Sequence, residues 1–168
     1  MTEISREIRL ASRPDGLPIA SNFELAETPV PEPGPGQVLV RNVYMSVDPS
    51  MRGRMNDVRS YVPPFQIGRP LEGRAVGRVV RSNDDLFRPG EAVGGSLGWR
   101  EFHVAEGRSL TKLDVSKAPL AAYLGVLGGT GFTAYVGMID IGQAKAGETV
   151  FVSGAAGATG AAPSGTSS

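Results

Sequence analysis

The stretch Thr149–Gly160, "TVFVSGAAGATG", joins a continuous apolar run to a turn that is rich in glycine. The run at 149–153 predicts a parallel strand, because such strands are buried on both faces. Gly154, Gly157 and Gly160 follow directly and allow the backbone to approach a pyrophosphate, as in a dinucleotide-binding fold. The spacing alone is equally compatible with an ordinary tight turn or a disordered tail.

The residues after this turn do not continue the pattern of a Rossmann domain. Pro163 follows two alanines, and "SGTSS" at 164–168 has no apolar periodicity. We expect too few residues here for a stable helix, for a second strand or for recognition of the adenosine ribose. The sequence therefore predicts a truncated Rossmann domain over 119–160 and a disordered tail over 161–168.

Two apolar stretches precede the strand and begin near Pro119. The segment 119–142, "PLAAYLGVLGGTGFTAYVGMIDIG", is divided by Gly128 and Gly129. Apolar stretches of this length are suited to helices, and Gly142 supplies a stop. We therefore expect these helices to open the Rossmann domain.

Residues 1–118 have a different character, with short alternating runs separated by glycine and proline. The chain contains 23 glycines and 13 prolines in 168 residues. Six or so short strands at such close spacing predict a small antiparallel barrel. The strand around 74–83 contains Gly77, which suggests a bulge or a close backbone approach.

The overall composition excludes several classes of function. Lys and Arg together number 17 and balance 17 Asp and Glu, so we expect no capture of nucleic acid or of an anionic membrane. Cysteine is absent and His103 is the one histidine, which makes zinc chemistry and thiol catalysis poor explanations. The N-terminus lacks the apolar core of a signal peptide, so we expect a cytoplasmic protein.

Four stretches together carry a resemblance to a known family: "RPDGLP…NFEL", "VYMSVDPSMRGRMND", "LGVLGGTGFTAYVGMIDIG" and "GETVFVSGAAGATG". In this order and spacing they resemble the zinc-independent medium-chain reductases, the group of leukotriene B4 dehydrogenase, prostaglandin reductase and curcumin reductase. The resemblance runs from about Arg9 to Gly160. It implies a mainly β (α+β) chain, with a GroES-like, substrate-side barrel over 1–118 and the start of an NAD(P)-binding Rossmann domain over 119–160.

The same resemblance implies a reaction. Members of this group use NADPH to reduce the carbon–carbon double bond of α,β-unsaturated ketones and aldehydes. Hydride moves to the β-carbon, and the resulting enolate needs hydrogen-bond donors and then a proton. Quinones, which are also enones, are the alternative small-molecule substrates.

Carried over by position, the turn "VDPSMRGRM" places Asp48, Ser50, Met51 and Arg52 in the substrate pocket. The family usually has tyrosine where this chain has Ser50. From the residues alone, Asp48 would cap the next turn and Arg52 would be a solvated or paired surface residue. No catalytic residue or proton donor is assigned.

The cofactor-binding residues implied by the resemblance lie in two stretches of the second half: Gly131, Thr133, Gly154, Ala156, Gly157, Ala158, Thr159 and Gly160. The family usually has Met-Pro where Gly129 and Thr130 stand. Without the family, Thr133 would be a helix hydroxyl that bonds back to its own helix. His103 is expected to lie on the surface.

These expectations lead to two readings of the chain. The first is a fragment of an NADPH-dependent enone reductase that is inactive alone, because half of the dinucleotide fold is missing. The second is a standalone GroES-like module for binding or assembly. In the fragment reading, the missing half of the fold leaves the edge of the strand at 149–153 exposed, and we expect it to favour a homodimer.

Overall fold

The computed structural model describes residues 3–60 and 62–162, and the chain divides into two compact units. The first unit spans Met1–Val115 and the second Ser116–Ser168. The sequence-based boundary was placed after residue 118. Of the tail expected over 161–168, residues 163–168 lie outside the described part. Each unit is described below by itself.

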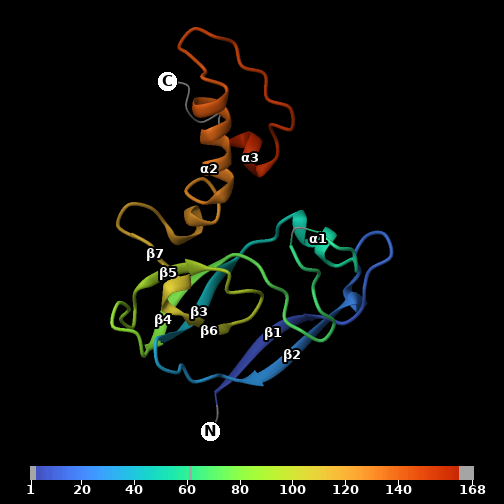
Figure 1. The fold of residues 1–168 in the computed structure, drawn as a ribbon, viewed down its shortest axis with the longest axis vertical. Coiled ribbons are helices and arrows are strands. Elements are labelled where there is room, and N and C mark those ends of the chain that lie inside the picture. Colours follow the sequence, from blue (N-terminus) through green and yellow to red (C-terminus); the bar gives the residue numbers. More distant parts are fainter. Residues whose placement is uncertain (1–2, 61, 163–168) are drawn as a thin grey trace. The chain divides into compact units, whose positions relative to one another are not determined.

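The first unit is built of short antiparallel strands, as predicted (Figure 1). A two-stranded sheet pairs β1 (Ile4–Leu10) with β2 (Phe23–Pro29). A five-stranded sheet has the order β6-β3-β4-β5-β7. Its strands are β3 (Gln37–Met45), β4 (Ala75–Ser82), β5 (Ala92–Gly95), β6 (Phe102–Glu106) and β7 (Thr111–Lys112). Three short helices connect strands, namely η1 (Ala20–Asn22), α1 (Ser50–Arg54) and η2 (Gly107–Ser109).

The first half of β3 is buried on both faces, at Val38, Leu39 and Val40, which explains the apolar run "VLV" there. Val38 and Val40 pack into one cluster with residues of β4 and β5, among them Val79 and Val93. Leu39 points the other way and packs against a different cluster, because successive side chains of a strand alternate. The strand therefore contributes side chains to two separate apolar clusters.

Strand β3 also carries the irregularity that Gly77 suggested. In the register with β4, Asn42 pairs with Gly77 and Tyr44 with Val76, so that Val43 is an extra residue. A Cβ atom at Gly77 would lie 2.3 Å from the backbone oxygen of Arg41. The prediction of a bulge and a close backbone approach is confirmed.

A further apolar cluster fixes helix α1 to the first sheet. It is formed by the buried residues Leu10, Met51, Met55, Phe65 and Leu71, with Ile8, Phe23 and Trp99 packed against it. The loop after α1 is also tied to β1 by backbone hydrogen bonds, since the Leu71 N–H donates to Ile8 and the Gly68 N–H to Leu10. The position of α1 is therefore determined by packing on both of its flanks.

The second unit is helical in its described part (Figure 1). Its elements are η3 (Leu120–Tyr123), α2 (Gly129–Tyr135), η4 (Val136–Ile141) and α3 (Ala158–Ala161). The two apolar stretches are helical as predicted, and Gly128 is the N-cap of α2. The segment η4 continues α2 as a π-helix.

One prediction for this unit was wrong, because 149–153 is not a strand. A strand needs a neighbour to bond its N–H and C=O groups, and the described part of this unit, 116–162, contains no strand that could pair with it. Phe151 is consequently 90% exposed. Ala161, which was assigned to the expected tail, belongs to α3.

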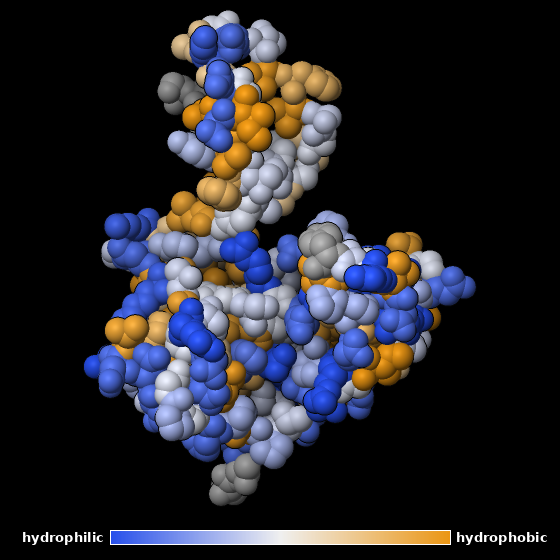
Figure 2. Space-filling view, viewed as in Figure 1, coloured by the Kyte–Doolittle hydropathy of each residue, from blue (hydrophilic) through white to orange (hydrophobic). Residues whose placement is uncertain are grey.

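Apolar side chains gather on the surface of the second unit, as the orange atoms over α2 show (Figure 2). The large exposed apolar residues here are Val126, Leu127, Phe132, Tyr135, Ile139, Ile141, Val150 and Phe151. Among the described helices of the whole chain, none is both long and apolar enough to traverse a bilayer.

Candidate functional site

Asp48 lies in the turn before α1 but does not cap the helix as the residue alone suggested, because no side-chain cap hydrogen bond is formed there. The Ser46 hydroxyl donates to Asp48 Oδ1 at 2.9 Å, and the Met51 N–H donates to the Asp48 backbone oxygen at 2.9 Å. Pro49 is the N-cap and has helical φ and ψ. Asp48 therefore supports the turn mainly through its carbonyl and through the hydroxyl that it accepts.

Met51 points into the protein. Its side chain is 6% exposed and packs in the apolar cluster with Leu10 and Leu71. The Asp48 N–H also approaches the Met51 sulfur at 3.4 Å. The structure thus gives Met51 a packing role, and its contact with cofactor and substrate remains a prediction.

Arg52 is engaged by the first loop of the chain. Its Nε and Nη2 donate to the backbone oxygen of Gly16 at 2.9 and 2.6 Å, and Nη1 donates to Asn56 Oδ1 at 2.7 Å. These bonds fasten the turn "RPDGLP" to α1, which is the paired surface role that the residue alone suggested. Its role toward cofactor or substrate stays a prediction.

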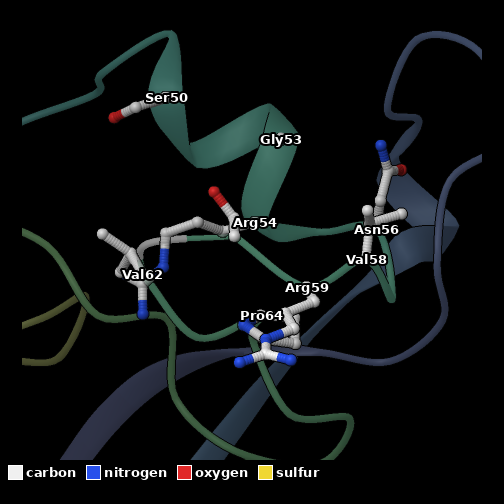
Figure 3. Close-up of a pocket in the computed structure, with 9 residues that line it drawn as sticks. Ser50, Gly53, Arg54, Asn56, Val58, Arg59, Val62 and Pro64 are labelled. Atoms are coloured by element: carbon white, nitrogen blue, oxygen red, sulfur yellow. The ribbon is translucent and has the colours of Figure 1, made fainter.

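Ser50 lines a pocket of about 530 Å³ between α1 and the loop that follows it. Figure 3 shows Ser50 and Gly53 on the helix, with Val58, Arg59, Val62 and Pro64 across the pocket from them. The described lining is completed by Arg54, Asn56 and Ser60. Cavities of this volume suit a small organic ligand.

Sequence reasoning missed most of this pocket because it assigned no pocket role to residues 56–64. The signal available was chemical, namely an arginine, a serine and an asparagine within 56–64, a segment that also contains two prolines. Such a loop can present polar groups without forming regular structure. Of the predicted pocket residues, Ser50 alone is in the described lining.

The glycine turn is formed even though no strand leads into it. Gly154 has φ 70°, a conformation that favours glycine, and its carbonyl accepts the Gly157 N–H at 2.8 Å. A Cβ atom at Gly160 would lie 2.4 Å from the Gly154 oxygen. The geometry of this turn therefore favours glycine at 154 and 160.

The remaining residues predicted to bind cofactor lie on this turn and on α2. Ala156, Ala158 and Thr159 are exposed, with Gly157 as the N-cap of α3. On α2, the Thr133 hydroxyl donates to the Gly129 oxygen at 2.8 Å, which is the local bond that the residue alone suggested.

Gly131 lines a smaller and mainly apolar pocket of about 230 Å³ on the helices of the second unit. Its described neighbours there are Val126, Ala134, Tyr135, Met138, Ile139 and Ala162. The predicted substrate residues thus belong to the first unit and the predicted cofactor residues to the second.

His103 is half-buried on β6, rather than on the open surface as expected. Burial, and then the charge of Arg100, lower the pKa of His103 to about 4. The imidazole is therefore neutral near pH 7. In the described residues, no cluster of His, Asp and Glu side chains could hold a metal ion.

Comparison with known proteins places this geometry in a family. A family model described as the N-terminal domain of oxidoreductase matches residues 6–113. The NADPH-dependent curcumin reductase of Escherichia coli (strain K12) is 50% identical over 152 residues, which cover 90% of this chain and 44% of that protein. The NADP(+)-dependent 2-alkenal reductase of Nicotiana tabacum is 39% identical over 162 residues, which cover 93% of this chain and 47% of that protein.

A solved structure of an oxidoreductase also matches this chain over about half of its own length. The crystal structure of CurA from Vibrio vulnificus in complex with NADPH matches with a TM-score of 0.85 and 43% identity, over 94% of this chain and 47% of that one. The chain spans about half the length of the curated relatives that it matches. It belongs to the medium-chain dehydrogenase/reductase family of oxidoreductases, and its residues 6–113 are that family's N-terminal domain.

Proposed function

We propose that this chain is the N-terminal half of a zinc-independent, NADPH-dependent reductase that acts on the carbon–carbon double bond of α,β-unsaturated ketones and aldehydes. The observation that carries this proposal is the 50% identity, over 90% of the chain, with an NADPH-dependent curcumin reductase. The similarity to a 2-alkenal reductase favours the same class of substrate. A cytoplasmic location and a homodimer remain predictions from the sequence.

The glycine turn would hold the pyrophosphate of NADPH. The turn is compatible with this group because Gly154, Gly157 and Gly160 leave the backbone bare on an exposed segment. The N–H groups at the start of a helix lack intrahelical partners and can donate to phosphate oxygens. Bound NADPH would supply the hydride for reduction.

The pocket beside Ser50 would hold the unsaturated compound. Apolar atoms of Val58, Val62 and Pro64 offer contact to its carbon skeleton, while Ser50 and Asn56 offer hydrogen bonds to polar groups. Asp48, Met51 and Arg52 would contribute by fixing α1, because each of them makes contacts that hold this helix in place.

The test is NADPH consumption by the full-length parent protein with a panel of enones, 2-alkenals and quinones, beside the 168-residue chain. We expect the parent to reduce enones and 2-alkenals, with saturated ketones and aldehydes as products. Failure to consume NADPH with any of them would refute the proposal, and turnover of quinones alone would favour the quinone reductase instead.

The chain itself is expected to have no useful reductase activity, because its described residues supply a single turn of the dinucleotide fold and no paired strand. A direct titration of the chain with NADPH checks this expectation. Stoichiometric binding in the micromolar range would overturn it.

A further inference from the structure

Trp99 contacts the segment that leads into α1, although the two are far apart in the sequence. Its indole N–H donates to the Ser46 backbone oxygen at 3.0 Å. Its ring packs against the apolar cluster that contains Met51 of α1. A Cβ atom at Gly73 would lie 3.3 Å from Met51 Cε and 3.5 Å from Trp99 Nε1, so both side chains approach this glycine closely. Trp99 therefore touches α1 through the cluster and the preceding segment through a hydrogen bond.

The backbone around Trp99 is fixed by hydrogen bonds to other segments. The Trp99 N–H donates to the Leu71 oxygen at 2.8 Å, and the Trp99 oxygen accepts the Ile8 N–H at 2.9 Å. Gly98 has φ 71°, and a Cβ atom there would lie 2.7 Å from the Leu71 oxygen, so this position favours glycine. The indole is thus presented from a backbone that is held on both sides.

Asn42 of β3 fixes the same segment through its side chain. Its Nδ2 donates to the backbone oxygens of Gly98 at 3.1 Å and of Arg100 at 2.8 Å, the residues on either side of Trp99. Asn42 lies next to Val43, the extra residue of the bulge. Bulges redirect the side chains beside them. The bulge of β3 is consequently connected to α1 through residues 98–100.

Ser46 passes this connection on to the helix. Its N–H donates to the Arg74 oxygen at 2.8 Å, and its hydroxyl donates to Asp48 Oδ1 at 2.9 Å. The helix begins at Ser50, directly after Pro49. Proline has a fixed φ, which makes the connection between Ser46 and α1 stiff. A displacement of Ser46 would therefore displace α1.

We infer that Trp99 is a positioning residue of the proposed reductase, which sets the place of α1 and thereby the affinity for the unsaturated substrate. Trp99 is not among the described residues that line the pocket, whereas Ser50 and Gly53 of α1 are. Its influence would act through the helix. This inference depends on the proposed function, because it treats the pocket as part of the substrate site.

The experiment measures kcat and KM for benzylideneacetone, at saturating NADPH, in the full-length parent protein and in two variants. Trp99→Phe removes the indole N–H but keeps an aromatic ring. Val93→Ala is the control for stability, because Val93 is 0% exposed and packs in the cluster with Val40 and Val79. Among the described residues, that cluster contains none from α1.

We expect Trp99→Phe to raise KM for the enone about threefold to tenfold, the range that corresponds to the loss of one hydrogen bond. The value of kcat should stay within about twofold, because a displaced wall weakens the binding of substrate and transition state alike. A lower stability alone reduces the amount of active enzyme, which lowers the apparent kcat and leaves KM unchanged. Val93→Ala should therefore keep the KM of the wild type.

Hydrogen exchange in the 168-residue chain follows α1 without any substrate. The Met51 N–H donates to the Asp48 oxygen and the Met55 N–H to the Met51 oxygen, so exchange of these amides reports local opening of the helix. Their rates are divided by that of Leu39 in β3, which corrects for global unfolding. We expect this ratio to rise about threefold to tenfold in Trp99→Phe and to stay unchanged in Val93→Ala.

The results distinguish failure of this inference from failure of the proposed function. If the wild-type parent reduces enones and Trp99→Phe keeps its KM, or if Val93→Ala raises KM equally, Trp99 does not position the site. An unchanged exchange ratio in Trp99→Phe would also overturn the inference. If the wild-type parent consumes no NADPH with any enone, the proposed function is refuted and the role of Trp99 in substrate affinity fails with it.

Discussion

The two units of this chain differ in the burial of their apolar side chains. In the first unit, side chains such as Leu10, Leu39 and Val93 are 0% exposed and pack in three apolar clusters. In the described part of the second unit, Ala134 is the single buried apolar residue. Helices can form from local hydrogen bonds, whereas burial requires a second layer. We therefore expect the stability of the chain to reside in the first unit.

The most direct way to break this comparison is a matched pair of leucine truncations. Leu39→Ala removes a fully buried side chain and should lower the free energy of unfolding by about 3 to 4 kcal/mol, because the cavity adds to the lost burial. Leu127→Ala removes a side chain that is 53% exposed and should change it by less than about 0.5 kcal/mol.

For Leu39→Ala, the free energy of unfolding of the first unit is measured by urea denaturation followed by tryptophan fluorescence. Trp99 is the one tryptophan of the chain and packs against the cluster at α1, so its emission reports on the first unit. Far-UV circular dichroism follows both units for Leu127→Ala. Equal costs for the two variants would show that the second unit is as tightly packed as the first.

Acid should weaken the first unit through His103, the one histidine of the chain. Its pKa is lowered from 6.5 to about 4, so the unfolded chain binds a proton that the folded chain does not. Stability should consequently fall as the pH is reduced from 6.5 to 4.5, by about 2 to 3 kcal/mol.

The size of this effect can be isolated by substitution. Hydrogen bonds with Lys112 and with Arg6 lower the pKa values of Glu91 and Glu101, so the stability that these two carboxylates contribute is lost at more acidic pH than the contribution of His103. His103→Gln should remove the acid-dependent loss in urea titrations followed by Trp99. A loss of the same size in the variant would assign it to other groups.

The smallest expected effect concerns two glycines, one in each unit. Gly77→Ala places a Cβ atom against the Arg41 backbone oxygen and should cost about 2 kcal/mol, as overpacking of a rigid backbone does. Gly137→Ala meets open space within η4 and should be neutral or slightly stabilising. Thermal unfolding of both variants checks this, and an unchanged midpoint for Gly77→Ala would contradict the close approach.

Much of the first unit could be predicted because its strands pair with strands of the same unit, so that the apolar pattern of each strand reflects the structure it forms. The run "VLV" predicted strand β3, and Gly77 of β4 predicted the bulge. Both features concern the contact between two adjacent strands, where side chains alternate and a missing side chain allows close approach. The apolar run at 149–153 led to the wrong prediction of a strand. Its formation depends on a neighbouring strand, which the described residues of its unit do not provide.

The candidate site was predictable in part. The glycine spacing at 154–160 predicted its own turn because each contact is made within seven residues. By contrast, the burial of Met51 and the attachment of Arg52 to Gly16 depend on contacts with segments far away in the sequence. The pocket lined by Arg59 also could not be predicted from the sequence, because a loop without hydrophobic periodicity forms one of its walls.

The unpaired residue at Val43 sets the phase of everything that follows it on β3. Because side chains alternate with a period of two, deleting this residue would turn Tyr44 and Met45 over. It would also displace Ser46, whose carbonyl accepts the indole N–H of Trp99 at 3.0 Å. At this position the number of residues is thus constrained more strictly than their identity, and the approach to α1 tolerates substitution better than insertion or deletion.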